Sequence, residues 1–165
     1  MPRLAGGARA SQQGDGEQRQ QTSHDRNDAA LHYAGAMAFH VVRLDELEWI
    51  ERDPEGGGPA RRVARLSDDV GWEHTRGNLW RYPPGAQGRR HRDTIQEETF
   101  VVVDGTLSVY LGDPPQRVDV PKGGLVHVES GTPLQLVNHG DGEVLLFAYG
   151  APPEAGGAEF LDSAV

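Results

Sequence analysis

Residues Gly85–Gly105 of this 165-residue chain read GAQGRRHRDTIQEETFVVVDG, and they say more about its fold than any other stretch. His91 and Asp93 are two positions apart, so an extended strand would point both side chains to the same face. Glu98 begins an apolar run typical of a second strand, and the Asp104-Gly105 pair after it is a hairpin turn signal. The sequence therefore predicts one imidazole and two carboxylates together inside a β structure, a setting for a divalent metal or for acid–base chemistry.

The chain from residue 37 onward alternates short apolar runs with tight turns rich in Gly, Pro, Asp and Asn. About nine such runs at a spacing of about ten residues, with almost no helical periodicity, are typical of an antiparallel sandwich or small barrel. One helical turn is expected over 45–53. Strands are expected over 38–44, 61–66, 78–82, 99–103, 106–111, 116–120, 125–128, 134–138 and 144–149. The predicted fold class is all-β.

The first 36 residues differ in composition from the rest of the chain. They are rich in Gln, Gly, Ala, Ser and Arg, show no hydrophobic periodicity, and carry four arginines against four acidic residues. Such a segment buries too little apolar surface to offset the entropy lost on ordering it. The sequence therefore predicts a disordered N-terminal arm over 1–36 and one folded domain over 37–165.

The net charge of the chain lies on this predicted domain. Residues 37–165 hold 12 Lys or Arg and 21 Asp or Glu, which accounts for the whole formal charge of −9. Such a surface repels phosphate backbones and anionic lipids, so we expect no nucleic-acid binding and no membrane binding. Cysteine is absent, which excludes disulfides and thiolate metal sites, and no run approaches the roughly 18 apolar residues of a membrane helix. We expect a cytoplasmic protein.

The spacing around His91 resembles the first motif of the cupin family, whose fold is a small double-stranded β-helix, or jelly-roll barrel. That motif reads G-x5-H-x-H-x3,4-E-x6-G. Gly85, His91, Glu98 and Gly105 stand at its intervals, and Asp93 takes the place of the second histidine.

The second cupin motif begins after a gap of 17 residues and is matched in part. It reads G-x5-P-x-G-x2-H-x3-N, and Gly123, Gly131 and Asn138 fit it. Two positions differ, and one of them places Leu134 where the motif has its histidine. Two motifs in order at this separation resemble small single-domain cupins of bacterial type, and the resemblance covers residues 78–149.

In typical cupins, three histidines and the glutamate hold a divalent metal. Carried over position by position, the resemblance implies His91, Asp93 and Glu98 as metal ligands, while Leu134 cannot coordinate a metal. This oxygen-rich set suits Mn²⁺, Fe²⁺ or Mg²⁺ better than Zn²⁺. The alternative is a cluster without metal, in which one carboxylate is protonated or is paired with His91 or an arginine, because two carboxylates inside a barrel repel each other.

Further side chains are candidates for the same barrel interior. His127 is a possible additional metal ligand if it points inward, and the alternative is an outward histidine on an edge strand. Arg81 or Arg89 could reach a carboxylate or phosphate of a ligand at the barrel mouth, and the alternative is balance of surface charge. The residues expected around the pocket are Trp80, Phe100, Leu134 and Asn138.

The leading hypothesis is a cupin that binds a small organic molecule in its barrel beside a weakly held divalent metal. If the protein is an enzyme, the resemblance implies oxygenase or isomerase chemistry. One alternative is a metal-free, non-catalytic module for ligand binding or dimerisation. Another is a metal-independent enzyme similar to cupin-like epimerases, in which His91 and an acidic partner transfer protons. Cupins commonly pair through edge strands, so we also expect a homodimer, with residues 39–44 as the candidate edge.

Overall fold

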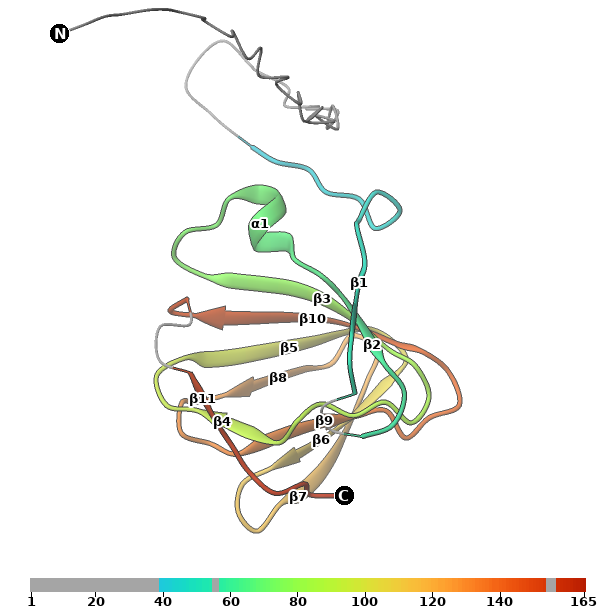
Figure 1. Cartoon of the computed structure of the whole chain (residues 1–165), viewed down its shortest axis with the longest axis vertical. Coiled ribbons are helices and arrows are strands. Elements are labelled where there is room, and N and C mark those ends of the chain that lie inside the picture. Colours follow the sequence, from blue (N-terminus) through green and yellow to red (C-terminus); the bar gives the residue numbers. More distant parts are fainter. Residues whose placement is uncertain (1–38, 55–56, 154–156) are drawn as a thin grey trace, which may run out of the picture. The chain divides into compact units, whose positions relative to one another are not determined.

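Antiparallel strands make up almost all of the regular structure in the described part of the chain. The computed structural model describes residues 39–54, 57–153 and 157–165 (Figure 1). Within these residues, eleven strands form one sheet of six strands and one of five. The fold is therefore all-β, as predicted. The arm predicted over 1–36 lies outside the described residues.

The larger sheet holds the strands on both sides of β5, which carries Glu98. Strand β10 pairs with β3 on one side and β5 on the other, and β8 forms the edge beyond β5. Its order is β1 (Ile50–Arg52), β2 (Arg61–Ala64), β3 (Arg76–Tyr82), β10 (Val144–Ala151), β5 (Glu97–Asp104) and β8 (Leu125–Val128). A single short helix, α1 (Leu66–Val70), connects β2 to β3 in the described residues.

The smaller sheet contains the strand that carries His91. This strand, β4, is held between two others, because His91 is the Cα partner of both Leu134 and Phe160. The order of the sheet is β11 (Ala158–Phe160), β4 (His91–Asp93), β9 (Leu134–Val137), β6 (Thr106–Leu111) and β7 (Gln116–Pro121).

The two sheets share one apolar core. Phe100 and Val102 of β5 belong to the same buried cluster as Leu107 and Val109 of β6. The period of two along each strand alternates these residues with outward-facing ones. Burial of each such side chain stabilises the fold by about 1.5–3 kcal/mol relative to its exposure.

The predicted turn at Asp104-Gly105 connects β5 of one sheet to β6 of the other. Gly105 has a φ of 84°, and a Cβ at this position would lie 3.0 Å from Val144 Cγ2. Both the backbone conformation and the lack of space therefore require glycine at this position of the motif.

The N-terminal part of the domain differs from the sequence prediction. Residues 39–44 form no strand. Their one backbone hydrogen bond to another described residue is donated by Glu46 N–H to the Arg43 carbonyl. Alternation alone does not form a strand without a neighbour to accept its hydrogen bonds. The helical turn predicted over 45–53 is also replaced, in part by β1. The homodimer stays a prediction. In the described residues, no helix combines the length and apolar character needed to cross a membrane.

Candidate functional site

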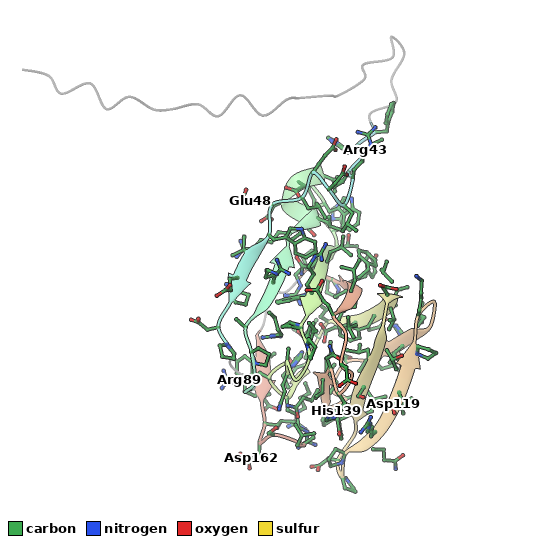
Figure 2. All side chains as sticks on the ribbon, turned by 90° about the vertical axis from the view of Figure 1, so that its right-hand side faces the viewer. Arg43, Glu48, Arg89, Asp119, His139 and Asp162 are labelled. Atoms are coloured by element: carbon green, nitrogen blue, oxygen red, sulfur yellow. The ribbon has the colours of Figure 1, made fainter. Side chains whose placement is uncertain are left out.

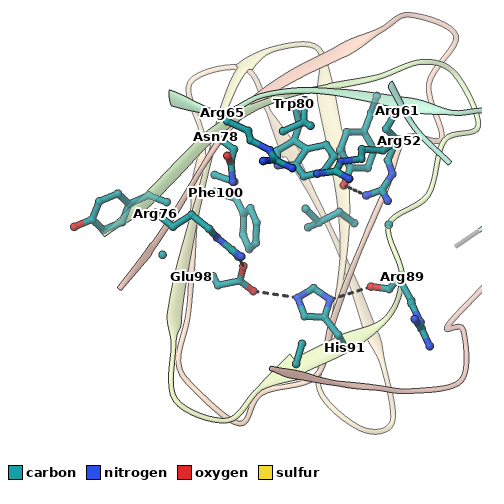
Figure 3. Close-up of a pocket in the computed structure, with 18 of the residues that line it drawn as sticks. Arg52, Arg61, Arg65, Arg76, Asn78, Trp80, Arg89, His91, Glu98 and Phe100 are labelled. Carbon is teal, nitrogen blue, oxygen red and sulfur yellow. Dashed lines mark hydrogen bonds and ion pairs between the residues drawn. The ribbon is translucent and has the colours of Figure 1, made fainter. Parts of the chain in front are cut away.

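A cavity of about 470 Å³ opens beside β3 and β5, within the range typical of small-molecule sites. The alternate residues of β3 from Arg76 to Tyr82 all face it, because successive side chains of a strand point to opposite sides. Figure 3 shows the labelled side chains converging on this space from several strands. Apolar lining comes from residues such as Val63, Trp80, Phe100, Leu136, Ala148 and Phe160.

His91 and Glu98 meet on the wall of this cavity. His91 Nε2 lies 3.2 Å from Glu98 Oε2, although the two residues belong to different sheets. The side chains keep only 24% and 10% of their exposure, so water screens their interaction weakly. The structure therefore brings together two of the three side chains of the predicted cluster.

The hydrogen bonds of His91 determine where its protons lie. Nδ1 is 2.9 Å from the backbone carbonyl of Arg89, which can only accept, so Nδ1 carries a hydrogen. A neutral ring then has no hydrogen on Nε2. The Nε2–Glu98 contact thus needs one more proton, held either by the imidazolium or by the carboxylic acid. The pair holds this proton at the cavity wall.

The surroundings favour the imidazolium–carboxylate form of the pair. Burial lowers the pKa of His91, but the hydrogen bonds to Glu98 and Arg89 and the charges of Glu98 and Asp93 together outweigh it. The pKa of His91 consequently lies above its ordinary value of 6.5. Arg76 Nη2 lies 3.6 Å from Glu98 Oε1, so the carboxylate group contacts an arginine as well as His91.

Asp93 is turned away from this pair to the backbone. Its Oδ1 accepts hydrogen bonds from the N–H groups of Ile95 at 3.0 Å and Gln96 at 2.7 Å. Aspartate commonly stabilises a turn in this way. Asp93 therefore fixes the turn between β4 and β5, and it is not among the residues that line the cavity.

The donor atoms at the cavity do not fit a tightly held divalent cation. Among the described residues, no group of three His, Cys, Asp or Glu side chains is placed to share a metal ion. Leu134 is 1% exposed in the core beside His91, and the guanidinium of Arg76 occupies the far side of Glu98. Of the predicted ligand set, one imidazole and one carboxylate remain at the cavity, fewer ligands than the three that catalytic metal sites commonly use. Metal binding stays a prediction.

His127, the possible additional ligand, lies on the outer side of β8. Its Nδ1 is 3.0 Å from Thr99 Oγ1 and its Nε2 is 3.8 Å from Glu97 Oε2, and its side chain is 48% exposed. It does not line the cavity, so the described structure corresponds to the outward alternative.

Two of the four expected pocket residues, Trp80 and Phe100, line the cavity, and two do not. Leu134 belongs to the apolar core. Asn138 is fully buried and donates to the carbonyls of Tyr82 at 2.8 Å and Gly142 at 2.7 Å, while its Oδ1 accepts from Gly140 N–H. Asn138 thus holds the turn after β9 by hydrogen bonds instead of lining the cavity.

The arginines around the cavity are the feature that sequence reasoning largely missed. Arg89 lines the cavity, whereas Arg81 contacts Glu143 at 2.6 Å on another face. Four further arginines line it that the sequence did not single out: Arg52, Arg61, Arg65 and Arg76. The sequence contained a signal for two of these arginines. Arg61, Val63 and Arg65 are each two positions apart, so a strand places all three on the same face.

Comparison with protein families matches residues 78–149 to the cupin domain family. This part of the chain is a cupin domain. The matched residues contain strands β4 to β9 and most of β3 and β10. No curated protein shows a significant sequence match to the chain.

Solved structures share the architecture of this cupin domain. A sugar phosphate isomerase from a cupin superfamily of Silicibacter pomeroyi is 24% identical, with 75% of this chain and 83% of that chain covered and a TM-score of 0.65. A polyketide cyclase from Streptomyces resistomycificus is 18% identical, with 74% and 85% covered and a TM-score of 0.64. A predicted oxalate decarboxylase from Thermotoga maritima is 18% identical, with 69% and 100% covered and a TM-score of 0.62. At these identities, the likeness establishes the fold alone.

Proposed function

We propose that this cupin domain binds a small organic molecule in its cavity and transfers a proton to and from it through His91 and Glu98, without a metal. The reaction class is that of an isomerase or epimerase acting next to a carbonyl group. The 3.2 Å contact between His91 Nε2 and Glu98 Oε2 on the cavity wall is the observation that carries the proposal. A proton donor and a proton acceptor in contact are the minimum that such a reaction requires.

In the imidazolium–carboxylate form, each partner has a distinct role. The Glu98 carboxylate accepts a proton from the substrate carbon next to the carbonyl, and His91 Nε2–H donates its proton to the carbonyl oxygen. The product of this step is a neutral enol. Glu98 then returns its proton to a carbon of the enol, and a hydroxyl group of the enol gives its proton to His91 Nε2. This step yields the isomer and regenerates the imidazolium–carboxylate pair.

Neighbouring groups support these roles. The Arg89 carbonyl orients the imidazole through Nδ1–H, so that Nε2 faces Glu98. The Arg76 guanidinium, 3.6 Å from Glu98 Oε1, lies on the side of the carboxylate away from His91 and helps to hold Glu98 in place. Trp80 and Phe100 give the cavity an apolar wall, which strengthens electrostatic interactions with a bound substrate by reducing contact with water.

Solvent deuterium exchange tests the proposal. Aldoses, ketoses, uronic acids and 2-oxo acids are incubated with the full chain in D₂O, and loss of the C–H signal is followed by ¹H NMR. We expect exchange with at least one class, unchanged by EDTA, and a loss of about a hundredfold or more in His91→Gln. His127→Gln is the matched control, since it removes a histidine that also lies beside a glutamate but on the outer face, and it should retain full exchange.

Three outcomes would contradict the proposal. They are equal exchange in His91→Gln and the wild type, no exchange with any of the four classes, and exchange that EDTA abolishes. The last outcome would favour a metal-dependent enzyme that uses the same two residues. Elemental analysis of protein purified without chelator, with Glu98→Ala as reference, then decides between the metal-dependent and the metal-free reaction. Metal near one equivalent that Glu98→Ala loses would support the metal-dependent reaction.

A further inference from the structure

Arg61 is a buried arginine that faces the cavity from β2. It is only 8% exposed. Its Nη1 donates to the Tyr82 hydroxyl at 3.0 Å, and its guanidinium lies 5.1 Å from the centre of the Trp80 ring. Nε is buried and makes no hydrogen bond. Nη2 makes no hydrogen bond to a described residue and is in contact with solvent, so it is the nitrogen that can reach a ligand.

The charge of Arg61 has no counter-ion among the described residues. No described carboxylate lies within 4.0 Å of it, although eight other arginines of the domain have such a partner. Burial raises the pKa of Tyr82 above 10.0, so the hydroxyl beside Arg61 stays neutral. Buried charges in proteins are normally paired, and arginine cannot lose its proton to avoid the cost. An anion from outside the chain would complete the site.

Two more arginines extend the positive charge around Arg61. Arg52 is its Cα partner across the β1–β2 pair, and Arg65 is four residues further along on the same side. Both line the cavity. In the described part of the chain, the exposed Asp68 is the sole ionic partner of Arg65, at 3.6 Å. Figure 3 shows Arg52, Arg61 and Arg65 close together on one side of the cavity, with His91 and Glu98 on the other.

The charge of the cavity is opposite to that of the whole chain. Among the described residues, five arginines line it against two carboxylates, Asp68 and Glu98, whereas the chain carries a net charge of −9. A positive cavity in a negative protein attracts anions of small size and repels large polyanions such as nucleic acid. This contrast favours a low-molecular-weight anion as the ligand.

From this arrangement we infer that the cavity takes a small organic phosphate, whose phosphate group binds Arg61 between Arg52 and Arg65. This inference rests on the proposed function, because it places the carbonyl end of the same substrate at His91 and Glu98. Guanidinium groups bind phosphate through parallel hydrogen bonds. Several arginines around one point match the double negative charge of a phosphate better than the single charge of a carboxylate.

Calorimetric titration of the full chain with inorganic phosphate at low ionic strength tests the inference. We expect saturable binding to the wild type and binding weaker by about tenfold or more in Arg61→Gln. Arg62→Gln is the matched control, because Arg62 is the next residue on β2 but points outward to Glu143 at 3.0 Å; it should bind phosphate as the wild type does. Arg65→Gln should also bind more weakly, and it serves in place of Arg61→Gln if that variant does not fold. Acetate should bind about tenfold more weakly than phosphate.

The outcomes separate this inference from the proton-transfer proposal. Phosphate binding that His91→Gln retains and Arg61→Gln loses would support a distinct phosphate position. Absence of phosphate binding in the wild type, equal losses in Arg61→Gln and Arg62→Gln, or acetate binding as tight as phosphate binding would overturn the inference. Proton transfer could still be intact in each of these cases, because the deuterium exchange assay includes uncharged aldoses and ketoses. Phosphate binding with no His91-dependent exchange would retain the anion site and refute the proton-transfer role.

Discussion

Two histidine–glutamate pairs lie on opposite faces of the same strand. Glu97 and Glu98 are neighbours on β5, and the alternation of the strand directs one outward and the other into the cavity. Outside, His127 Nε2 lies 3.8 Å from Glu97, and the side chains are 48% and 59% exposed. Inside, His91 Nε2 lies 3.2 Å from Glu98, and both side chains are mostly buried. Figure 2 shows the side chains of the described residues as sticks on both faces of the strands.

The comparison shows that the position of a pair in the fold, more than its residue types, determines its chemistry. Water surrounds the outer pair, which screens its charges and weakens its contact. The inner pair has fixed hydrogen-bond partners in Arg89 and Arg76 and faces a cavity that a ligand can enter. Of the two pairs, only the inner one therefore has the setting that the proposed proton transfer requires.

The largest difference in unfolding free energy between an inner and an outer substitution should come from an apolar residue. Leu134 is 1% exposed beside His91, whereas Leu125 at the outer edge strand is 60% exposed. Leu134→Ala should lower the free energy of unfolding by about 2–5 kcal/mol, because it leaves a cavity in the core. Leu125→Ala should change it by less than about 0.5 kcal/mol. Urea unfolding followed by fluorescence measures both, and equal losses would show that β9 does not form the core described here.

A smaller difference should separate the two glutamates in the same unfolding experiment. Glu98→Ala leaves His91 and Arg76 beside a buried space without their carboxylate, so a loss of about 1–3 kcal/mol is expected. Glu97→Ala removes one partner of an exposed ion pair and should cost less than about 0.5 kcal/mol. Near-equal values would mean that Glu98 is solvated in solution and that the inner pair does not exist as described.

The smallest expected effect is a shift in the pKa of His91. Because the pKa of His91 is raised in the folded state, its ion pair stabilises the fold fully below its unfolded pKa of about 6.5. This contribution is lost as the pH rises through the folded pKa. NMR of the imidazole signals should give a His91 pKa that falls in Glu98→Gln and is unchanged in Glu97→Gln. A His91 pKa that is the same in all three proteins would remove Glu98 as its proton partner.

Several strands and turns of this fold could be predicted from the sequence, because residue alternation and turn residues there agree with the tertiary structure. The strands predicted over 106–111 and 125–128 have exactly these bounds, and the turn at Gly105 is where the sequence placed it. Residues 39–44 show the limit of such signals, because alternation predicts a strand only where a neighbouring strand is available.

The site was predictable in part for a similar reason. The spacing of His91 and Glu98 was informative, whereas the role of Asp93 depends on a competition that spacing does not reveal. A carboxylate at the end of a short strand can point inward or accept nearby backbone N–H groups, and here the N–H groups of Ile95 and Gln96 bind it. The cluster around Arg61 was missed because it forms only when β1, β2 and β3 lie side by side.

Part of the cavity wall comes from β11, the last described strand along the chain. Strand β11 pairs with β4, and its Ala158 and Phe160 form part of the cavity wall, where the Arg89 guanidinium lies 3.5 Å from the Phe160 ring centre. A ribosome releases this strand after every other strand of the two sheets. A nascent chain can thus assemble most of its core while the cavity still lacks one wall, and the cavity is complete only after β11 has been synthesised.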